Sequence, residues 1–200
     1  FAALKQGMDY VTLTDHDEYT QNEVVFEELK NNPELLKRYV SGTEFTIDDE
    51  RLGHIIHVNV YGHSRKEFEK LMLLRDNVLL FVDYCKRRRL MFQYNHPIWF
   101  ELGRDKTIEE KNFKAIYENL AGEFLARMLG KGITSGSDEH LGRIGKMGYT
   151  LARGETFREF WDNVVKRESN IVRCNLNSDN LRRNVLEVID NLAFQTNMER

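Results

Sequence analysis

Residues 39–62 read YVSGTEFTIDDERLGHIIHVNVYG, and the fold prediction depends first on this stretch. It contains two runs of β-branched and aromatic residues, 39–47 and 54–62, on either side of the acidic turn DDERLG. Runs of this length between turn residues are typical of strands in a sheet. The stretch therefore predicts two consecutive strands, each of which contains a residue that can bind a metal.

Helical and strand-like segments continue to alternate on both sides of this pair. Preceding it are a helix tail closed by Gly7, a strand over MDYVTLTD (8–15) and a helix over 22–32 that stops before Pro33. After it, Ser64 is expected to cap one long helix through about Arg89, and LMFQYNHP (90–97) is expected to form a strand that proline ends.

The second half of the chain continues the alternation. Expected strands are KAIYENL (114–120, with a helix as the alternative), GITSGSDEH (132–140, running into a loop), GYTLA (148–152) and IVRCN (171–175); expected helices are 106–112, 123–129, 156–168 and 180–196. Strand and helix in alternation predict a largely parallel sheet, closed as a barrel. We expect a single domain over residues 1–200, with motifs in 1–154 and closing elements in 155–200.

Composition limits the class of protein. The 200 residues are 41% hydrophobic and 30% charged, which suits one globular domain with a sizeable core. The net charge of −3 argues against a general polyanion-binding surface. No window resembles a membrane helix, the first residues do not resemble a signal peptide, and the two cysteines lack CxxC spacing. These features predict a cytoplasmic protein without membrane partners.

Six residues that can hold a divalent metal lie at or just beyond the predicted strands. They are His16 in TLTDHD, Glu44 in SGTEFT, His57 in HIIHVNVYG, His96 in QYNHP, and Asp138 and His140 in GSDEH. Imidazole nitrogens and carboxylate oxygens are the donors of hydrolytic metal centres, which leave one position open for water. A barrel collects such residues from many strands onto one face. The pattern therefore predicts a metallohydrolase.

Each candidate also has a plainer interpretation. His16 is either a ligand oriented by Asp15 or Asp17, or a solvent-facing residue in a turn that those aspartates cap. Glu44 is either a ligand or an outward-facing strand residue. His54 competes with His57 for one role, and the alternation in VNVYG favours His57.

The other candidates are His63, His96 and the GSDEH segment. His63 is expected at the surface or as a helix cap. Because Pro97 ends its strand, His96 is expected at a strand terminus, where function is common. Asp138 and His140, two residues apart, would project on one side if the strand persists.

The order of the motifs resembles that of the PHP (polymerase and histidinol phosphatase) family. The motifs are TDHD, a glycine and a glutamate, a histidine-containing strand, HP and GSDxH. The resemblance covers about residues 1–154. It implies a distorted seven-stranded β/α barrel, similar to a TIM barrel, and up to three zinc, manganese or iron ions. It also implies hydrolysis of phosphate esters by a metal-bound hydroxide, on small phosphomonoesters, nucleotides or oligonucleotides.

The resemblance also implies how the ligands are shared. Glu44 would bridge, with His57 and His96 completing one metal; Asp138 would join a second, and His16 and His140 a third. The family's first-strand HxH motif and the aspartate that follows it are missing. We therefore expect an N-terminally truncated barrel that lacks its first strand.

The missing ligands motivate a second hypothesis, a non-catalytic PHP-like module that binds a metal or a phosphate group. Arg143 is the candidate for binding a substrate phosphate. An equally good interpretation is that Arg143 forms a salt bridge at the surface. The apolar face of 180–196 is expected to close the core, or else to form a homodimer contact.

Overall fold

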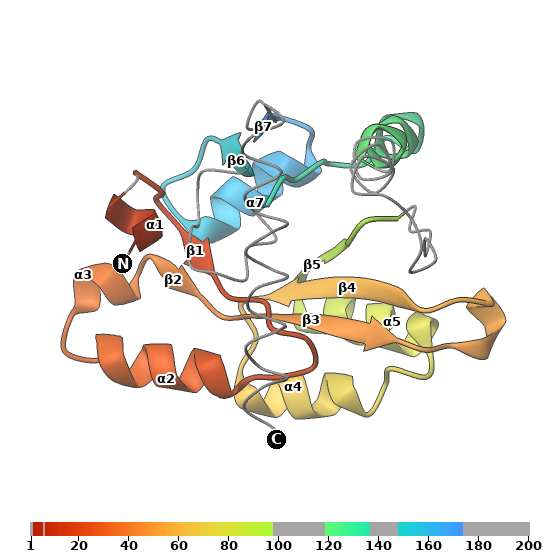
Figure 1. Cartoon of the computed structure of the whole chain (residues 1–200), viewed down its shortest axis with the longest axis horizontal. Helices are drawn as coiled ribbons and strands as arrows, with labels where there is room; N and C mark the ends of the chain where they lie inside the picture. The colour runs from red at the N-terminus through yellow and green to blue at the C-terminus, as the bar shows by residue number, and fades with distance from the viewer. Residues whose placement is uncertain (1, 6, 98–118, 137–147, 174–200) are drawn as a thin grey trace, which may run out of the picture. The chain divides into compact units, whose positions relative to one another are not determined.

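The computed structural model describes residues 2–5, 7–97, 119–136 and 148–173 (Figure 1). The chain folds as two compact units. The described part of one is residues 9–97; that of the other is 2–5, 7–8, 119–136 and 148–173. All of the predicted metal ligands that the structure describes lie in the first unit.

The centre of the first unit is an antiparallel sheet of three strands in the order β3-β4-β5, formed by β3 (Gly42–Ile47), β4 (Ile56–Tyr61) and β5 (Met91–Tyr94). β3 and β4 are the two strands expected from residues 39–62. Their connection holds only a short 3₁₀ turn, η1 (Glu50–Leu52), and Gly53 in the left-handed conformation (φ 69°). A parallel pair needs a crossover of about a dozen residues or more, so these strands pair antiparallel.

The connection from β4 to β5 contains two helices, α4 (Arg65–Met72) and α5 (Val78–Arg88), where the sequence predicted one. A capping box of Ser64 and Glu67 starts α4, and the Asn77 side chain accepts a hydrogen bond from Leu80 N (3.1 Å) to start α5. The two helices return the chain to the end of the sheet that it left, because Met91 lies opposite Tyr61. The break between the helices therefore makes β5 antiparallel to β4.

Side chains alternate between the two faces of this sheet, and one face is apolar. α4 and α5 lie against that face (Figure 1). The core contains Tyr19, Phe45, Ile47, Val58, Val60, Phe68, Leu71, Phe81 and Cys85. On these helices Phe68 and Leu71 are buried, whereas Leu79 is 67% exposed because α5 starts anew at Asn77. The opposite face of the sheet is left for polar residues.

The N-terminal part of this unit runs beside β3. β1 (Val11–Thr12) pairs in parallel with β2 (Tyr39–Val40), and an isolated bridge joins His16 to Glu44 in the same register. The crossover from β1 to β2 contains α2 (Thr20–Leu29) and α3 (Pro33–Leu36). A Cβ at Gly42 would meet Thr12 Oγ1 and lie 2.7 Å from Leu13 O. Glycine at this position therefore lets the two segments approach and sets His16 beside Glu44.

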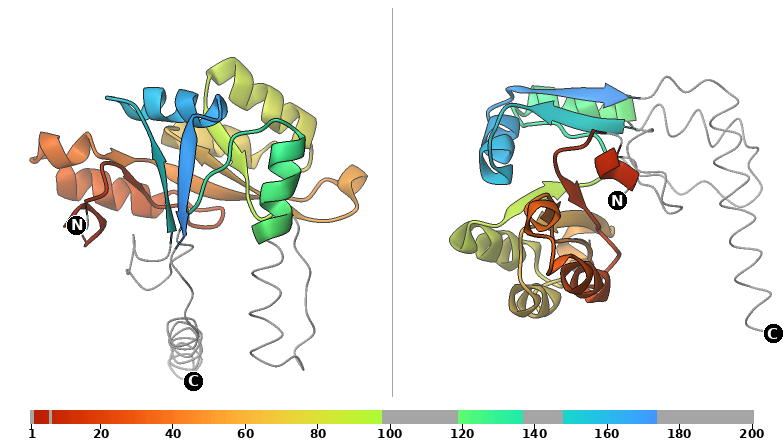
Figure 2. Two further views of the ribbon diagram at one scale, coloured as in Figure 1. Left: turned by 90° about the horizontal axis from the view of Figure 1, so that it is seen from above. Right: turned by 90° about the vertical axis from the view of Figure 1, so that its left-hand side faces the viewer.

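The second unit contains a two-stranded sheet. β6 (Gly148–Ala152) pairs antiparallel with β7 (Ser169–Arg173), as Figure 2 shows, and α7 (Phe157–Val165) connects them. Thr156 caps α7 by accepting a hydrogen bond from Glu159 N, and Trp161 and Val164 are buried. This unit also contains α1 (Ala2–Lys5) and the helical residues 119–128.

The expected barrel is wrong for the part of the chain that the structure describes. Its sheets have two, three and two strands, the sheets β3-β4-β5 and β6-β7 are antiparallel, and none of its sheets closes. Alternation of helix and strand does not distinguish a single crossover helix from a returning pair, and this ambiguity is what misled the prediction.

Two smaller predictions also need correction. Residues 119–120 of KAIYENL are helical, and residues 132–136 of GITSGSDEH form no strand; Ser135 instead bonds the Thr150 side chain (2.8 Å). The helices expected at 106–112 and 180–196 lie outside the described residues. None of the described helices is long and apolar enough to cross a membrane.

Candidate metal centre

The polar face of the β3-β4-β5 sheet carries the candidate site. In the antiparallel register Glu44 lies opposite Asn59, and His57 lies opposite Thr46, so all four side chains project from one face. Phe45 and Val58, the intervening pair, project into the core. The same alternation that buries the apolar residues therefore brings Glu44 and His57 together.

Glu44 Oε1 lies 3.4 Å from His57 Nδ1 and 3.4 Å from His96 Nε2, and the two nitrogens are 3.5 Å apart. Asn95 N donates a hydrogen bond to His57 O (2.9 Å), which ties the end of β5 to β4 and brings His96 to the site. Three donor atoms from three strands or strand ends thus form a nearly equilateral triangle.

This triangle fits the ligand set of one divalent metal. Bonds of about 2.0–2.1 Å at tetrahedral angles place neighbouring donors about 3.3 Å apart, close to the observed edges. Glu44 is 6% exposed, and its Oε1 is buried without a hydrogen bond. Burying a carboxylate oxygen without a hydrogen bond costs free energy, and a bound cation would offset that cost.

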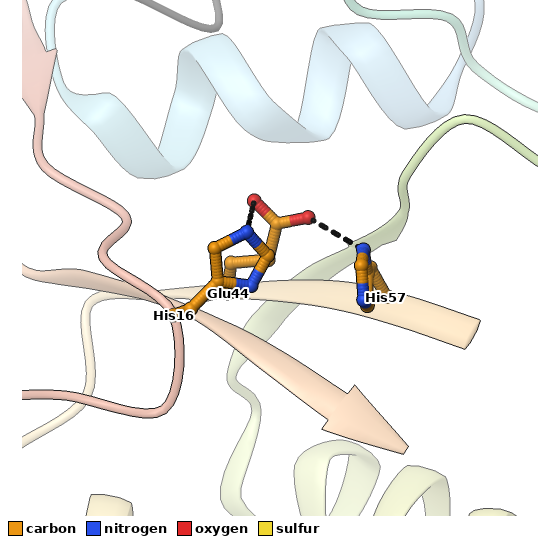
Figure 3. A group of neighbouring side chains, drawn as sticks. All are labelled: His16, Glu44 and His57. Carbon is orange, nitrogen blue, oxygen red and sulfur yellow. Dashed lines mark ion pairs between the residues drawn. The ribbon is translucent and has the colours of Figure 1, made fainter. Parts of the chain in front are cut away.

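His16 approaches the other oxygen of the same carboxylate. Its Nε2 is 3.9 Å from Glu44 Oε2, and the rings of His16 and His57 are 5.0 Å apart. Ligand atoms of His16, Glu44 and His57 all lie within 4.8 Å of one another, and the three side chains point toward one another in Figure 3. This cluster can bind a metal ion.

The protonation states suit metal binding. Burial raises the pKa of Glu44, but the side chains of His96 and Asn95 and the imidazole of His16 outweigh burial, so the pKa lies below its ordinary value. Burial lowers the pKa of His57; the Glu44 carboxylate opposes this shift, and His96 adds to it. At neutral pH the carboxylate is therefore charged and the His57 imidazole is neutral, which is the form of each that binds metals.

Two residues of this region have unusual backbone angles. Asp17, directly after His16, has φ 51°, and His96 has φ 25°. Left-handed angles are uncommon for residues other than glycine and persist only where the surroundings fix them. The chain therefore adopts disfavoured conformations at two of the points where it delivers imidazoles to Glu44.

The structure separates the competing histidines. His54 is exposed, and its Nδ1 lies 2.9 Å from Leu52 O, whereas His57 is at the site. His63, expected at the surface or as a helix cap, is 2% exposed and packs among the rings of Tyr19, Phe45 and Phe68. The expectation for His63 was wrong because it considered only the start of the next helix and not the core beside it.

Sequence reasoning missed Asn59 and Asn95, two buried polar residues of this region. The alternation in HVNVY was the available signal, because it places Asn59 on the same face as His57. Asp138, His140 and Arg143 lie outside the described residues. The structure therefore brings together four of the six predicted ligands: His16, Glu44, His57 and His96.

No protein-family model matches the chain, and the searches of curated proteins and of solved structures likewise found no significant match.

Proposed function

We propose that the protein is a metal-dependent phosphoesterase. The observation that carries this proposal is the triangle of Glu44 Oε1, His57 Nδ1 and His96 Nε2, with edges of 3.4–3.5 Å around a buried carboxylate oxygen that lacks a hydrogen bond. Two imidazoles and one carboxylate are a common ligand set of catalytic zinc, and three protein ligands leave a position for water or substrate. The ordered motifs that resemble the PHP family point to phosphate esters as the substrate class.

Each residue has a distinct part in this proposal. His57 and His96 supply neutral donors, and Glu44 supplies the negative charge that holds a cation in the buried face. The second oxygen of Glu44 lies 3.9 Å from His16 Nε2, so His16 would add a further donor beside the same carboxylate. A divalent metal such as zinc, manganese or iron, when bound, polarises phosphoryl oxygens and acidifies a water for attack on phosphorus.

The experiment is metal analysis of the purified protein, followed by hydrolysis of p-nitrophenyl phosphate, nucleotides and short oligonucleotides after loading with zinc, manganese or iron separately. We expect at least one ion per chain and hydrolysis that chelation abolishes and metal restores. Glu44→Gln is the matched control, because it keeps the shape of the side chain and removes its charge. If the chain binds metal stoichiometrically but hydrolyses none of these substrates, the proposed phosphoesterase activity is refuted.

That last outcome would favour a second candidate, a metal-binding module without catalytic activity. One observation favours it: within residues 2–5, 7–97, 119–136 and 148–173, the possible ligands that come together at this site include a single carboxylate, Glu44. Absence of metal binding at micromolar zinc, manganese and iron would count against both candidates.

A further inference from the structure

We infer that Arg75 and Asp17 are positioning residues, which hold His16 against Glu44 and so set the metal affinity of the centre. This inference rests on the proposed metal centre. It starts from the exposure of His16, whose side chain is 53% exposed while that of Glu44 is 8% exposed. Packing therefore does little to fix the His16 ring, and its placement depends on the backbone around it.

Backbone hydrogen bonds hold that segment on both sides of His16. Asp17 N donates to Glu44 O (2.9 Å), and Glu44 N donates to Asp15 O (3.2 Å). These two bonds form the isolated bridge between His16 and Glu44. The bridge ends at Asp17, whose φ of 51° is disfavoured for a residue with a side chain.

The Asp17 side chain stabilises this conformation by reaching across to β3. Its Oδ1 accepts a hydrogen bond from Thr46 N (3.0 Å), two residues beyond Glu44. Its Oδ2 pairs with Arg75 Nη1 at 2.7 Å. The carboxylate thus ties the residue after His16 to the strand that carries Glu44, and Arg75 neutralises its charge.

The break between α4 and α5 is what delivers Arg75. Arg75 O accepts a hydrogen bond from Asp48 N (3.0 Å) at the end of β3, and Arg75 Nε donates to Met72 O (3.3 Å). The arginine is therefore held at both its backbone and its side chain. The ion pair is only partly exposed, 34% at Arg75 and 26% at Asp17, so solvent screens it less than a fully exposed pair.

Geometry assigns Arg75 and Asp17 to positioning rather than to the ligand set. The cluster of possible ligand atoms consists of His16, Glu44 and His57, and Asp17 is engaged by Thr46 and Arg75. Groups that orient a ligand commonly change metal affinity by about 10- to 100-fold when removed. A purely structural ion pair would change stability without acting through His16.

The test combines a metal-free readout with a metal titration of the full chain. In metal-free protein, NMR hydrogen exchange is followed at the Asp17 and Thr46 amides; zinc affinity is then measured by calorimetric titration. The variants are Arg75→Gln, Arg75→Lys, Asp17→Asn, His16→Ala and the double variant His16→Ala/Arg75→Gln. Arg65→Gln is the control, since Arg65 forms a comparable pair with Glu23 (2.8 Å, 41% exposed) in the same unit.

Arg75→Gln is expected to speed exchange of both amides and to weaken zinc binding about tenfold. Arg75→Lys should recover part of both losses, and Arg65→Gln should change neither. In the His16→Ala background, Arg75→Gln should weaken zinc binding no further, because its effect passes through His16.

Unchanged amide exchange in Arg75→Gln would overturn the inference, as would an equal loss of zinc affinity with and without His16. If the amides respond as expected but the wild-type chain binds no zinc, the positioning stands and the proposed function fails. The two failures are therefore distinguishable.

Discussion

The carboxylate of Glu44 and the imidazole of His57 lie 3.4 Å apart although the two residues are not paired across their strands. In the register Glu44 lies opposite Asn59, and His57 lies opposite Thr46, so the contact is diagonal. Diagonal neighbours in a sheet are within reach of long or aromatic side chains. The site is thus a product of register, and a slip of β4 by one residue would move His57 to the core face and away from Glu44.

Replacing Glu44 should separate stability from metal binding. Although burial raises it, the pKa of Glu44 is held below its ordinary value by His96, Asn95 and His16. Glu44→Gln therefore removes a charge that is favourable in the folded chain, and metal-free protein should melt below the wild-type temperature. Zinc at a hundredfold excess over its dissociation constant should stabilise the wild type by about 2.7 kcal/mol and the variant by much less. Differential scanning calorimetry with and without zinc measures both effects; equal zinc stabilisation would contradict the site.

The two neighbouring histidines provide a matched pair. His57→Ala removes a donor of the triangle and should weaken zinc binding by more than about 100-fold, beyond the usual cost of losing a group that merely orients a ligand. His54→Ala should leave affinity unchanged, because His54 is exposed and its ring faces Leu52 O. Calorimetric titration checks the pair, and a larger loss in His54→Ala would reverse the assignment.

His63 should make the fold sensitive to acid. Burial lowers its pKa to about 4 from the ordinary 6.5. The unfolded chain takes up this proton as pH falls below 6.5, whereas the folded chain does so only near 4, so stability present above pH 6.5 is lost between these values. The loss is at most about 1.4 kcal/mol per pH unit.

His63→Phe keeps an aromatic ring among Tyr19, Phe45 and Phe68 and removes the titrating group. Urea unfolding at neutral pH and at about pH 5 should show a smaller loss of unfolding free energy in this variant than in the wild type. An equal loss in the two proteins would mean that other groups account for the acid sensitivity.

Gly42→Ala should disturb both the fold and the site. The new Cβ would meet Thr12 Oγ1 and the Leu13 carbonyl at 2.7 Å, at a cost of about 1–3 kcal/mol in unfolding free energy. Because this contact lies in the register that holds His16 beside Glu44, zinc affinity should fall as well. Gly53→Ala is the control: its φ of 69° makes it destabilising, but nothing lies within 4 Å and zinc affinity should persist.

Asn77 should be responsible for starting α5 after the helix break. Asn77→Ala removes the acceptor of Leu80 N and should lower the unfolding free energy by about 1 kcal/mol. Asn77→Asp retains an acceptor and should cost less. Urea unfolding measures both, and an Asn77→Ala variant as stable as the wild type would show that the cap contributes nothing.

Local features were predictable because they depend on short stretches of chain. β-branched runs located β3, β4, β6 and β7, Gly7 marked the end of α1, and the alternation in VNVYG favoured His57 over His54. Helix breaks were not predictable in this way. Residues 73–77 continue the apolar spacing of α4, and only the contacts of Arg75 and Asn77 with β3 and η1 show why the chain turns there.

The sequence by itself determined which residues can bind a metal and that several of them lie in strands or just beyond them, because donor chemistry and strand propensity are local properties. Tertiary structure decided strand direction, since two short helices return the chain where one long helix would have crossed the sheet. It also decided which donors meet: Glu44, His57 and His96 converge only through the antiparallel register, and His16 joins them through a close approach at Gly42. Such convergence depends on contacts between residues far apart in the chain, which no local pattern contains.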